Sequence, residues 1–248
     1  MFRILVADLF IDIEPRYASI KELCRDYLIP REEGRDPDIL IHISDLELQR
    51  EISACSWPVR PETAEIICIS KALGRELPRF DALFLHGATF TACGKTFAIS
   101  ADSGTGKTTL LRYCRDLLGN RLTILNGDKT IIRYRNGRMT AYGTPWCGKE
   151  GWGENMSSSL TGIILLSRGE INHIEEVDPM THLSALVRQV YIPEEGFEYS
   201  EKLTEILDHL LEQIKVYRIR CRKDPDAARV LFKGIGIDLG EKDYEIQG

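Results

Sequence analysis

The sequence predicts an α/β protein, with a mixed sheet and flanking helices at residues 81–248 and a small α/β lobe before it at residues 1–80. Three observations predict this fold class. Strand-like and helix-like segments alternate along the chain. The dipeptide Asn136-Gly137 lies between two apolar runs and marks an antiparallel hairpin. A glycine-rich loop at 101–107 follows an apolar strand and precedes a helical pattern, which is the order found around a phosphate-binding loop, or P-loop.

Composition and charge exclude several classes of protein. A chain of 248 residues with 43% hydrophobic residues is long enough to bury a sizeable core. Its net charge of −6 is unlike that of a nucleic-acid-binding protein, and no apolar run reaches the roughly 18 residues of a membrane span. The start, Met1 to Asp8, is too short and too acidic for a signal peptide. The 7 cysteines form no C-x-x-C pair, which indicates reduced thiols. We therefore expect a cytoplasmic protein without nucleic-acid or membrane partners.

The first 80 residues show alternating elements but no motif that carries chemistry. In chain order we expect one or two strands, a further strand and two helices, at residues 2–13, 39–43, 46–54 and 61–74. The second helix begins with Pro61, which suits the first helical turn because the missing N–H is not needed there.

The middle of the chain reads as strand, hairpin, loop and helix. We expect two strands, 83–90 and 96–100, joined at Cys93-Gly94. After the glycine-rich loop we expect a helix that continues through Leu118 and is stopped by Gly119-Asn120. A buried strand at 122–125 follows, and then the two strands of the Asn136-Gly137 hairpin, at 130–134 and 139–142.

The last third alternates strands and helices again. We expect a strand at 160–166 paired with a strand at 171–177, and a helix from Asp178-Pro179 to about Val190. An amphipathic helix at 203–214, a strand at 216–220 and a helix opened by Asp224-Pro225 complete the pattern.

The stretch ISADSGTGKTTLL, residues 99–111, ends as a P-loop should, in Gly106-Lys107-Thr108. The usual motif has a glycine where this chain has Ala101, at the strand end. Successive backbone N–H groups at a helix N-terminus attract phosphate, Lys107 suits the β- and γ-phosphates, and the Thr108 hydroxyl suits Mg²⁺. The predicted nucleotide-binding residues are therefore Asp102, Ser103, Gly104, Thr105, Gly106, Lys107, Thr108 and Thr109.

Hairpin register predicts two further site residues. A turn centred on Cys93-Gly94 places His86 across from Ala101, or beside Asp102 if the register slips by one residue. Either register brings His86 to the edge of the phosphate site.

Asp128 directly follows the buried strand after the loop helix, and the Asn136-Gly137 register places it opposite Pro145. The polar run 146–155 therefore begins beside it and is a candidate substrate or metal loop. Asp128 has two possible roles, to hold Mg²⁺ or to accept a proton from an attacking hydroxyl.

These residues resemble a known family. LHGATFTACGKTFAISADSGTGKTTLL, residues 85–111, is similar to the His-Gly strand, hairpin and P-loop of the HPr kinase/phosphorylase catalytic domain, and SGTGKTT also resembles phosphoenolpyruvate carboxykinase, which shares that fold. The chain also resembles HPr-kinase-like proteins found beside peptide-modification genes, in the segments LNGDKTIIR, TPWCGKEGW and GIILLSRGE. The resemblance covers roughly residues 83–190.

The resemblance implies an HPr kinase/phosphoenolpyruvate carboxykinase-like P-loop fold and a phosphotransferase that uses ATP and Mg²⁺. It implies a catalytic role for a histidine at His86 and for an acidic pair at positions 127 and 128, of which this chain keeps only Asp128 because Gly127 takes the first place. Glu150 is the candidate for a further metal ligand beside Thr108 and Asp128, and Arg168 for neutralising the transferred phosphate.

Three functions follow as hypotheses. The first is a kinase that transfers the γ-phosphoryl group of ATP to a hydroxyl, of a serine in a peptide or protein or of a small molecule. The second is a nucleotide-binding regulatory protein without catalysis, which Ala101 and Gly127 favour. The third is a phosphorylase that uses phosphate or pyrophosphate. Relatives in this fold group often assemble, so a homo-oligomer is one expected state.

Overall fold

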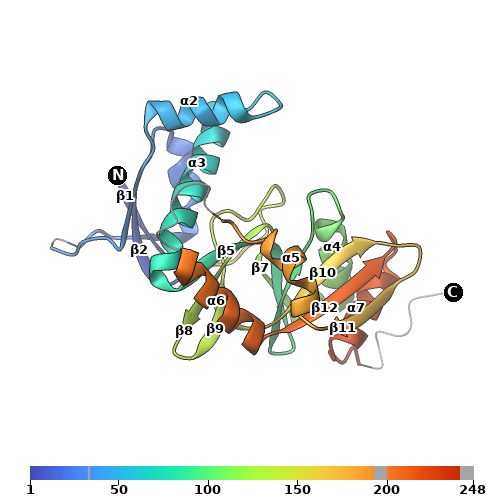
Figure 1. Ribbon diagram of the computed structural model, residues 1–248. Helices are drawn as coiled ribbons and strands as arrows, with labels where there is room; N and C mark the ends of the chain where they lie inside the picture. The colour runs from blue at the N-terminus through green and yellow to red at the C-terminus, as the bar shows by residue number, and fades with distance from the viewer. Residues whose placement is uncertain (33, 193–199, 241–248) are drawn as a thin grey trace.

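A computed structural model describes residues 1–32, 34–192 and 200–240 (Figure 1). A smaller N-terminal lobe with α2 and α3 stands at one end, and a larger unit carries the remaining sheet and helices. Within the described residues, no helix combines the length and apolar character of a membrane span. All 7 cysteines are free thiols, as the scattered spacing predicts.

The N-terminal lobe is a sheet of strand order β3-β1-β2-β4 covered by helices. Strands β1 and β2 form an antiparallel hairpin whose turn, Ala7-Asp8, has positive φ at both residues. The expected strands and helices are present, and the short α1 and β3 were not predicted. The elements are β1 (Phe2–Val6), β2 (Leu9–Glu14), α1 (Ala18–Leu23), a 3₁₀ turn (Arg25–Tyr27), β3 (Leu28–Ile29), β4 (Ile39–His42), α2 (Asp45–Ala54), α3 (Pro61–Glu76) and a second 3₁₀ turn (Leu77–Phe80).

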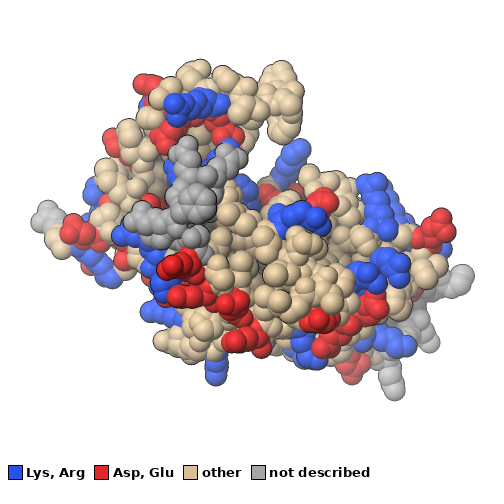
Figure 2. Space-filling view, in the orientation of Figure 1, with Lys and Arg blue, Asp and Glu red and all other residues tan. Residues whose placement is uncertain are grey.

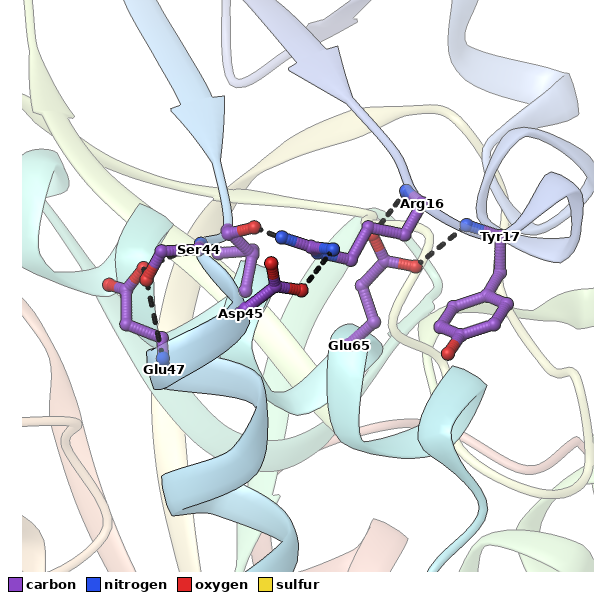
Figure 3. A network of polar contacts seen from close by, with 7 residues as sticks. Arg16, Tyr17, Ser44, Asp45, Glu47 and Glu65 are labelled. Atoms are coloured by element: carbon purple, nitrogen blue, oxygen red, sulfur yellow. Dashed lines mark hydrogen bonds and ion pairs between the residues drawn. The ribbon is translucent and has the colours of Figure 1, made fainter.

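A buried carboxylate holds the lobe's connections to α3 (Figure 3). Glu65 of α3 is fully buried and accepts hydrogen bonds from the backbone N–H groups of Arg16 and Tyr17, at 2.7 and 3.1 Å. Arg16 in turn donates to the carbonyl of Ile43 and forms an ion pair with Asp45. One carboxylate therefore fixes the chain entering α1, and the arginine beside it fixes the chain entering α2.

The lobe packs directly onto the larger unit. Phe84, Tyr142 and Trp146 of the larger unit belong to the lobe's own apolar cluster, and the rings of Phe84 and Trp146 meet edge to face at 5.8 Å. Arg133 donates to the carbonyl of Ala7 at 2.6 Å. Apolar contacts therefore cross the predicted boundary at residue 80, and the boundary itself stays a prediction.

The larger sheet is mixed, as predicted, with strand order β11-β12-β10-β6-β5-β8-β9. Strand β10 is parallel to β6 and β12, and the other pairs are antiparallel. The start of β10 also pairs with β9, and the far half of β5 pairs with β7. The strands are β5 (Ala82–Ala92), β6 (Lys95–Ser100), β7 (Leu122–Asn126), β8 (Lys129–Arg135), β9 (Arg138–Tyr142), β10 (Ser157–Arg168), β11 (His173–Val177) and β12 (Lys215–Cys221).

Helices cover both faces of this sheet (Figure 1). On one face, α4 (Lys107–Leu118) and α7 (Asp226–Gly234) share an apolar cluster with Phe90 and Phe97. On the other, α5 (Leu183–Val187) and α6 (Ser200–Gln213) pack over Leu85 and Ile163. The amphipathic pattern that predicts α6 is confirmed, because Leu203, Ile206, Leu210 and Ile214 are all buried. A 3₁₀ turn (Gly119–Arg121) follows α4.

The strand predicted at 171–177 has a different partner from the expected one. It forms β11, whose residues pair with β12, for example Ile174 with Ile219, rather than with β10. The edge of β10 is already taken by β12 in parallel, after the crossover through α6. Because β10 and β11 are adjacent in the chain, the sequence predicts a hairpin between them. Instead, β12 lies between them and pairs with both.

The helix predicted from Asp178 to Val190 is shorter and broken. It begins as a 3₁₀ turn (Met180–His182) and continues as α5, which ends at Val187. The next residues turn along β5 instead, where His86 N–H donates to the Gln189 carbonyl at 2.7 Å and Tyr191 N–H to the Phe84 carbonyl at 3.0 Å. Tertiary hydrogen bonding therefore ends the helix early.

Candidate functional site

The glycine-rich loop connects the end of β6 at Ser100 to the start of α4 at Lys107. Gly104 and Gly106 have φ of +77° and +123°, which residues with a side chain rarely adopt. Ala101 is 6% exposed and its methyl lies in the apolar cluster under α4. The alanine in the glycine position is therefore accommodated by packing, and the loop still turns at its two later glycines.

Lys107 begins α4 with its side chain buried and folded back over the loop. Its Nζ donates to the Ala101 carbonyl at 2.6 Å. Burial lowers the pKa of this lysine, and the carboxylates of Asp128 and Asp102 act in the opposite direction. The ammonium group therefore lies within the field of two carboxylates, at the point where the P-loop motif would place a triphosphate.

The register predicted for the Cys93-Gly94 hairpin is confirmed. Gly87 pairs with Ser100, so the same register brings the next residue back, His86, level with the first loop residue, Ala101. The Ser100 hydroxyl also donates a hydrogen bond to the His86 carbonyl at 2.8 Å. The His86 side chain, 39% exposed, lies with Nε2 3.4 Å from Asp128 Oδ1. The two residues that hairpin register singled out thus lie side by side at the loop.

Asp128 is held by backbone and by its neighbours. The buried Asn126 side chain accepts hydrogen bonds from the N–H groups of Asp128 and Lys129, at 2.8 and 2.7 Å, and its amide donates to Thr144. The sequence predicts no role for Asn126, although an asparagine whose side chain accepts a hydrogen bond from the backbone N–H two residues later forms an Asx turn.

The pKa of Asp128 is lowered, first by its hydrogen bond with His86 and then by the positive charges around it, with burial acting against them. The carboxylate is therefore ionised at neutral pH.

Gly127 takes the place of the other acid of the pair that the resemblance implies, and the structure gives a steric reason. A Cβ at Gly127 would lie 2.6 Å from the Cys147 carbonyl oxygen and 3.2 Å from that of Trp152. The backbone of the following loop therefore fills the space that an acidic side chain would need.

We expect Gly127→Ala to destabilise the fold by about 1–3 kcal/mol, because the added methyl group overpacks a backbone contact. Urea unfolding measures the change. Lys149→Ala, in the same loop with an exposed side chain, is the control and should shift stability by less than about 0.5 kcal/mol. Equal stability of Gly127→Ala and wild type would contradict the close packing of the two segments.

The polar run 146–155 packs against the loop helix as well as beside Asp128. The guanidinium of Arg115 lies 4.4 Å from the Trp152 ring centre, and Glu154 N–H donates to the Leu125 carbonyl. Glu150 is exposed in this run. Among the described residues, no group of three or more His, Cys, Asp or Glu side chains could hold a metal, so the structure does not bring Glu150 together with His86 and Asp128.

Two further side chains brace the loop from outside. Arg168, at the end of β10, donates to the carbonyls of Gly104 and Thr105, at 2.6 and 3.4 Å. Gln189 donates to Asp102 Oδ1 at 3.1 Å. Arg168 was predicted as a phosphate partner and here contacts the loop backbone. Gln189 was not predicted, since nothing in the sequence shows that the segment after α5 returns to this loop.

Cavities open on both sides of the loop. A cavity of about 600 Å³ includes Ser103 and Arg188 in its wall, and one of about 550 Å³ includes Thr109 and Tyr113. The loop residues Gly104 and Thr105 separate the two, and Thr108 is half-buried in the first turn of α4. Figure 2 shows a recess between the lobe and the larger unit, with lysine and arginine side chains along its edge.

Comparison with known proteins finds a weak structural likeness and no match in sequence. No protein-family model matches the chain, and no curated protein sequence matches it. Among solved structures, the HPr(Ser) kinase/phosphatase from Coxiella burnetii is similar, with 12% sequence identity and a TM-score of 0.36 over 62% of this chain and 93% of that chain. A likeness at this level carries no argument about mechanism.

Proposed function

We propose that the protein is a phosphotransferase that moves the γ-phosphoryl group of ATP to a hydroxyl group. The observation that carries the proposal is the convergence of a glycine-rich loop, a buried lysine and a His–Asp pair at one edge of the sheet. His86 and Asp128 are 3.4 Å apart, and the charge of Asp128 acts on the Lys107 ammonium. Phosphoryl transfer needs positioning and charge neutralisation more than covalent help, and these residues are of the types that provide both.

In this proposal the donor lies across the loop. Backbone N–H groups between Gly104 and Thr108 hold its phosphates, because successive N–H groups at a helix N-terminus attract anions. Lys107 leaves the Ala101 carbonyl to reach the β- and γ-phosphates. The nucleoside occupies the cavity of about 550 Å³ beside Thr109 and Tyr113. In this proposal the terminal phosphate extends along the loop toward Lys107 and Asp128.

The residues present fit a magnesium ion. The Asp128 carboxylate is ionised and 36% exposed, and the Thr108 hydroxyl lies one residue beyond Lys107. Mg²⁺ is commonly held by one or two protein oxygens with water and phosphate oxygens completing the octahedron. When bound, it neutralises charge that develops on the phosphates. Glu150 is a weaker candidate ligand, because among the described residues it forms no group of three or more potential metal ligands with Asp128 and His86.

The acceptor hydroxyl faces the His–Asp pair. As its oxygen bonds to the γ-phosphorus and the bond to the leaving ADP oxygen breaks, Asp128 accepts the hydroxyl proton and His86 holds the carboxylate in place. ADP leaves with the electron pair of the broken bond. Arg168 keeps the loop backbone in position through its hydrogen bond to the Gly104 carbonyl.

Labelled ATP tests the proposal. The protein is incubated with ATP labelled at the γ-phosphate, with Mg²⁺ and a mixture of peptide and small-molecule acceptors, and the label is located by mass spectrometry. We expect transfer to a hydroxyl group that stops when EDTA removes Mg²⁺. ATP uptake without loss of the γ-phosphate would instead support a regulatory nucleotide-binding protein, and exchange of labelled inorganic phosphate would support a phosphorylase.

A further inference from the structure

A further cavity has His86 in its wall and shares Arg188 and Gln189 with the 600 Å³ cavity beside the nucleotide loop. It measures about 260 Å³ and is lined by residues of α3, β5, the start of β8 and the segment after α5. Phe84 and Val190 form part of an apolar wall, and His86, Lys129 and Arg188 contribute nitrogen groups. Its volume suits a small molecule or the end of a larger one, since drug-sized sites begin near 300 Å³.

Strand pairing places Lys129 directly beside His86. The two residues are partners in the antiparallel register of β5 and β8. Side chains of such partners point to the same face of a sheet, with Cβ atoms about 5 Å apart. A molecule in this cavity that presents a group to His86 therefore also meets Lys129.

The Lys129 ammonium has no carboxylate partner within 4 Å among the described residues. Its Nζ donates to the Ser70 hydroxyl at 2.9 Å, and that hydroxyl donates onward to the Ile67 carbonyl. Lys71, which lines the same cavity, is different because it forms a 2.5 Å ion pair with Glu51. The Asp128 and Glu51 carboxylates act on this ammonium only from beyond ion-pair distance. A half-buried ammonium without a direct ion-pair partner gains from an anion that joins it.

Arg188 and Gln189 line the same cavity as Lys129 and add hydrogen-bonding groups to it. The Arg188 side chain lies at the border of this cavity and the 600 Å³ cavity beside the loop, and it makes no hydrogen bond or ion pair with the described part of the chain. Gln189 is 6% exposed, and its Oε1 is buried without a hydrogen-bond partner in the residues the structure describes. Polar atoms left in this state are uncommon in folded proteins and suit a bound polar ligand.

We propose that the phosphoryl acceptor is a hydroxylated molecule that also carries an anionic group, a carboxylate or a phosphate ester, and that Lys129 binds this anion while the hydroxyl faces His86 and Asp128. The inference rests on the proposed phosphotransferase function and names its substrate class. Ser70 of the N-terminal lobe holds Lys129, so the lobe takes part in acceptor recognition through α3.

Binding of small analogues tests this directly. Glycerate, glycerol 3-phosphate and neutral glycerol are titrated into the protein saturated with Mg²⁺ and a non-hydrolysable ATP analogue, and binding is followed by calorimetry. We expect both anions to bind at least about tenfold more tightly than glycerol, since hydrogen bonds to a charged group are the stronger kind. Lys129→Met should remove this preference, whereas the matched control Lys71→Met should keep it because its charge is already paired.

A second measurement does not depend on the folding of a variant. Anion binding to the wild-type protein should slow acetylation of Lys129 by an activated ester by at least about threefold, with Lys71 as the internal reference. Equal binding of glycerol and the anions, or acetylation of Lys129 that the anions leave unchanged, would overturn the inference. Anion binding that the ATP analogue abolishes would place the anion in the glycine-rich loop and would also overturn it. A separate titration of the ATP analogue into the free protein reports on the proposed function independently of the acceptor.

Discussion

Asp128→Asn is expected to slow phosphoryl transfer by about 10²–10⁴-fold, which is the usual contribution of a positioned general base. The amide has nearly the shape of the carboxylate, so it keeps the contacts of Asp128 with the 146–155 run, but it neither accepts the hydroxyl proton nor carries the charge that faces Lys107. Nucleotide affinity should stay close to that of the wild type. Single-turnover transfer from labelled ATP and calorimetric titration of ADP measure the two effects separately.

The matched control is Asp116→Asn, on the exposed side of α4, which changes the same functional group away from the site. Its transfer rate should equal that of the wild type. If Asp128→Asn transferred phosphate at the wild-type rate, the role given to the His–Asp pair would be wrong, although the nucleotide loop could still stand.

Lys107→Ala is expected to weaken binding of ATP by about 10- to 100-fold and to lower transfer as well, because one charged hydrogen-bond donor to the phosphates is worth about 1.5–3 kcal/mol. The stability of the fold should change little, because relief of a buried ammonium group, whose pKa is lowered by burial, offsets the lost hydrogen bond to the Ala101 carbonyl. Isothermal calorimetry gives the affinity and urea unfolding gives the stability. Lys21→Ala, on the exposed surface of the distant lobe, is the control. Unchanged ATP affinity in Lys107→Ala would show that the loop does not hold the phosphates.

Hairpin turns explain why part of the site could be predicted from sequence. The pairs Cys93-Gly94 and Asn136-Gly137 both have positive φ at each residue, the geometry of tight turns that fix strand register. Register then placed His86 at the loop, and Asp128 follows the strand that ends beside it. These are local relations, and a single sequence contains all the information they need.

Other site residues could not be predicted, because their contacts join segments that are far apart in the sequence. Gln189 reaches Asp102 only because the segment after α5 turns along β5, and the sequence indicated a continuous helix there. The Lys129 ammonium is held by a hydrogen bond to Ser70, which lies in the N-terminal lobe, far away in the sequence. The partner of β11 was missed for the same reason, since a crossover strand takes the place that adjacency suggested.

The structure gives a steric reason why glycine stands at position 127, where the expected motif has an acidic residue. From sequence alone, a missing acid at this position favoured a protein without catalysis. The backbone of Cys147 lies where the side chain would be, so the loop and the strand end fit each other around a glycine. The site therefore has to be judged as one carboxylate paired with one imidazole.

The most direct test is a crystal structure with Mg²⁺ and a non-hydrolysable ATP analogue. We expect the Lys107 ammonium to leave the Ala101 carbonyl, now 2.6 Å away, and to contact the β- and γ-phosphates, with the γ-phosphate next to Asp128 and His86. An analogue bound elsewhere, or a γ-phosphate directed away from the His–Asp pair, would contradict the proposed function.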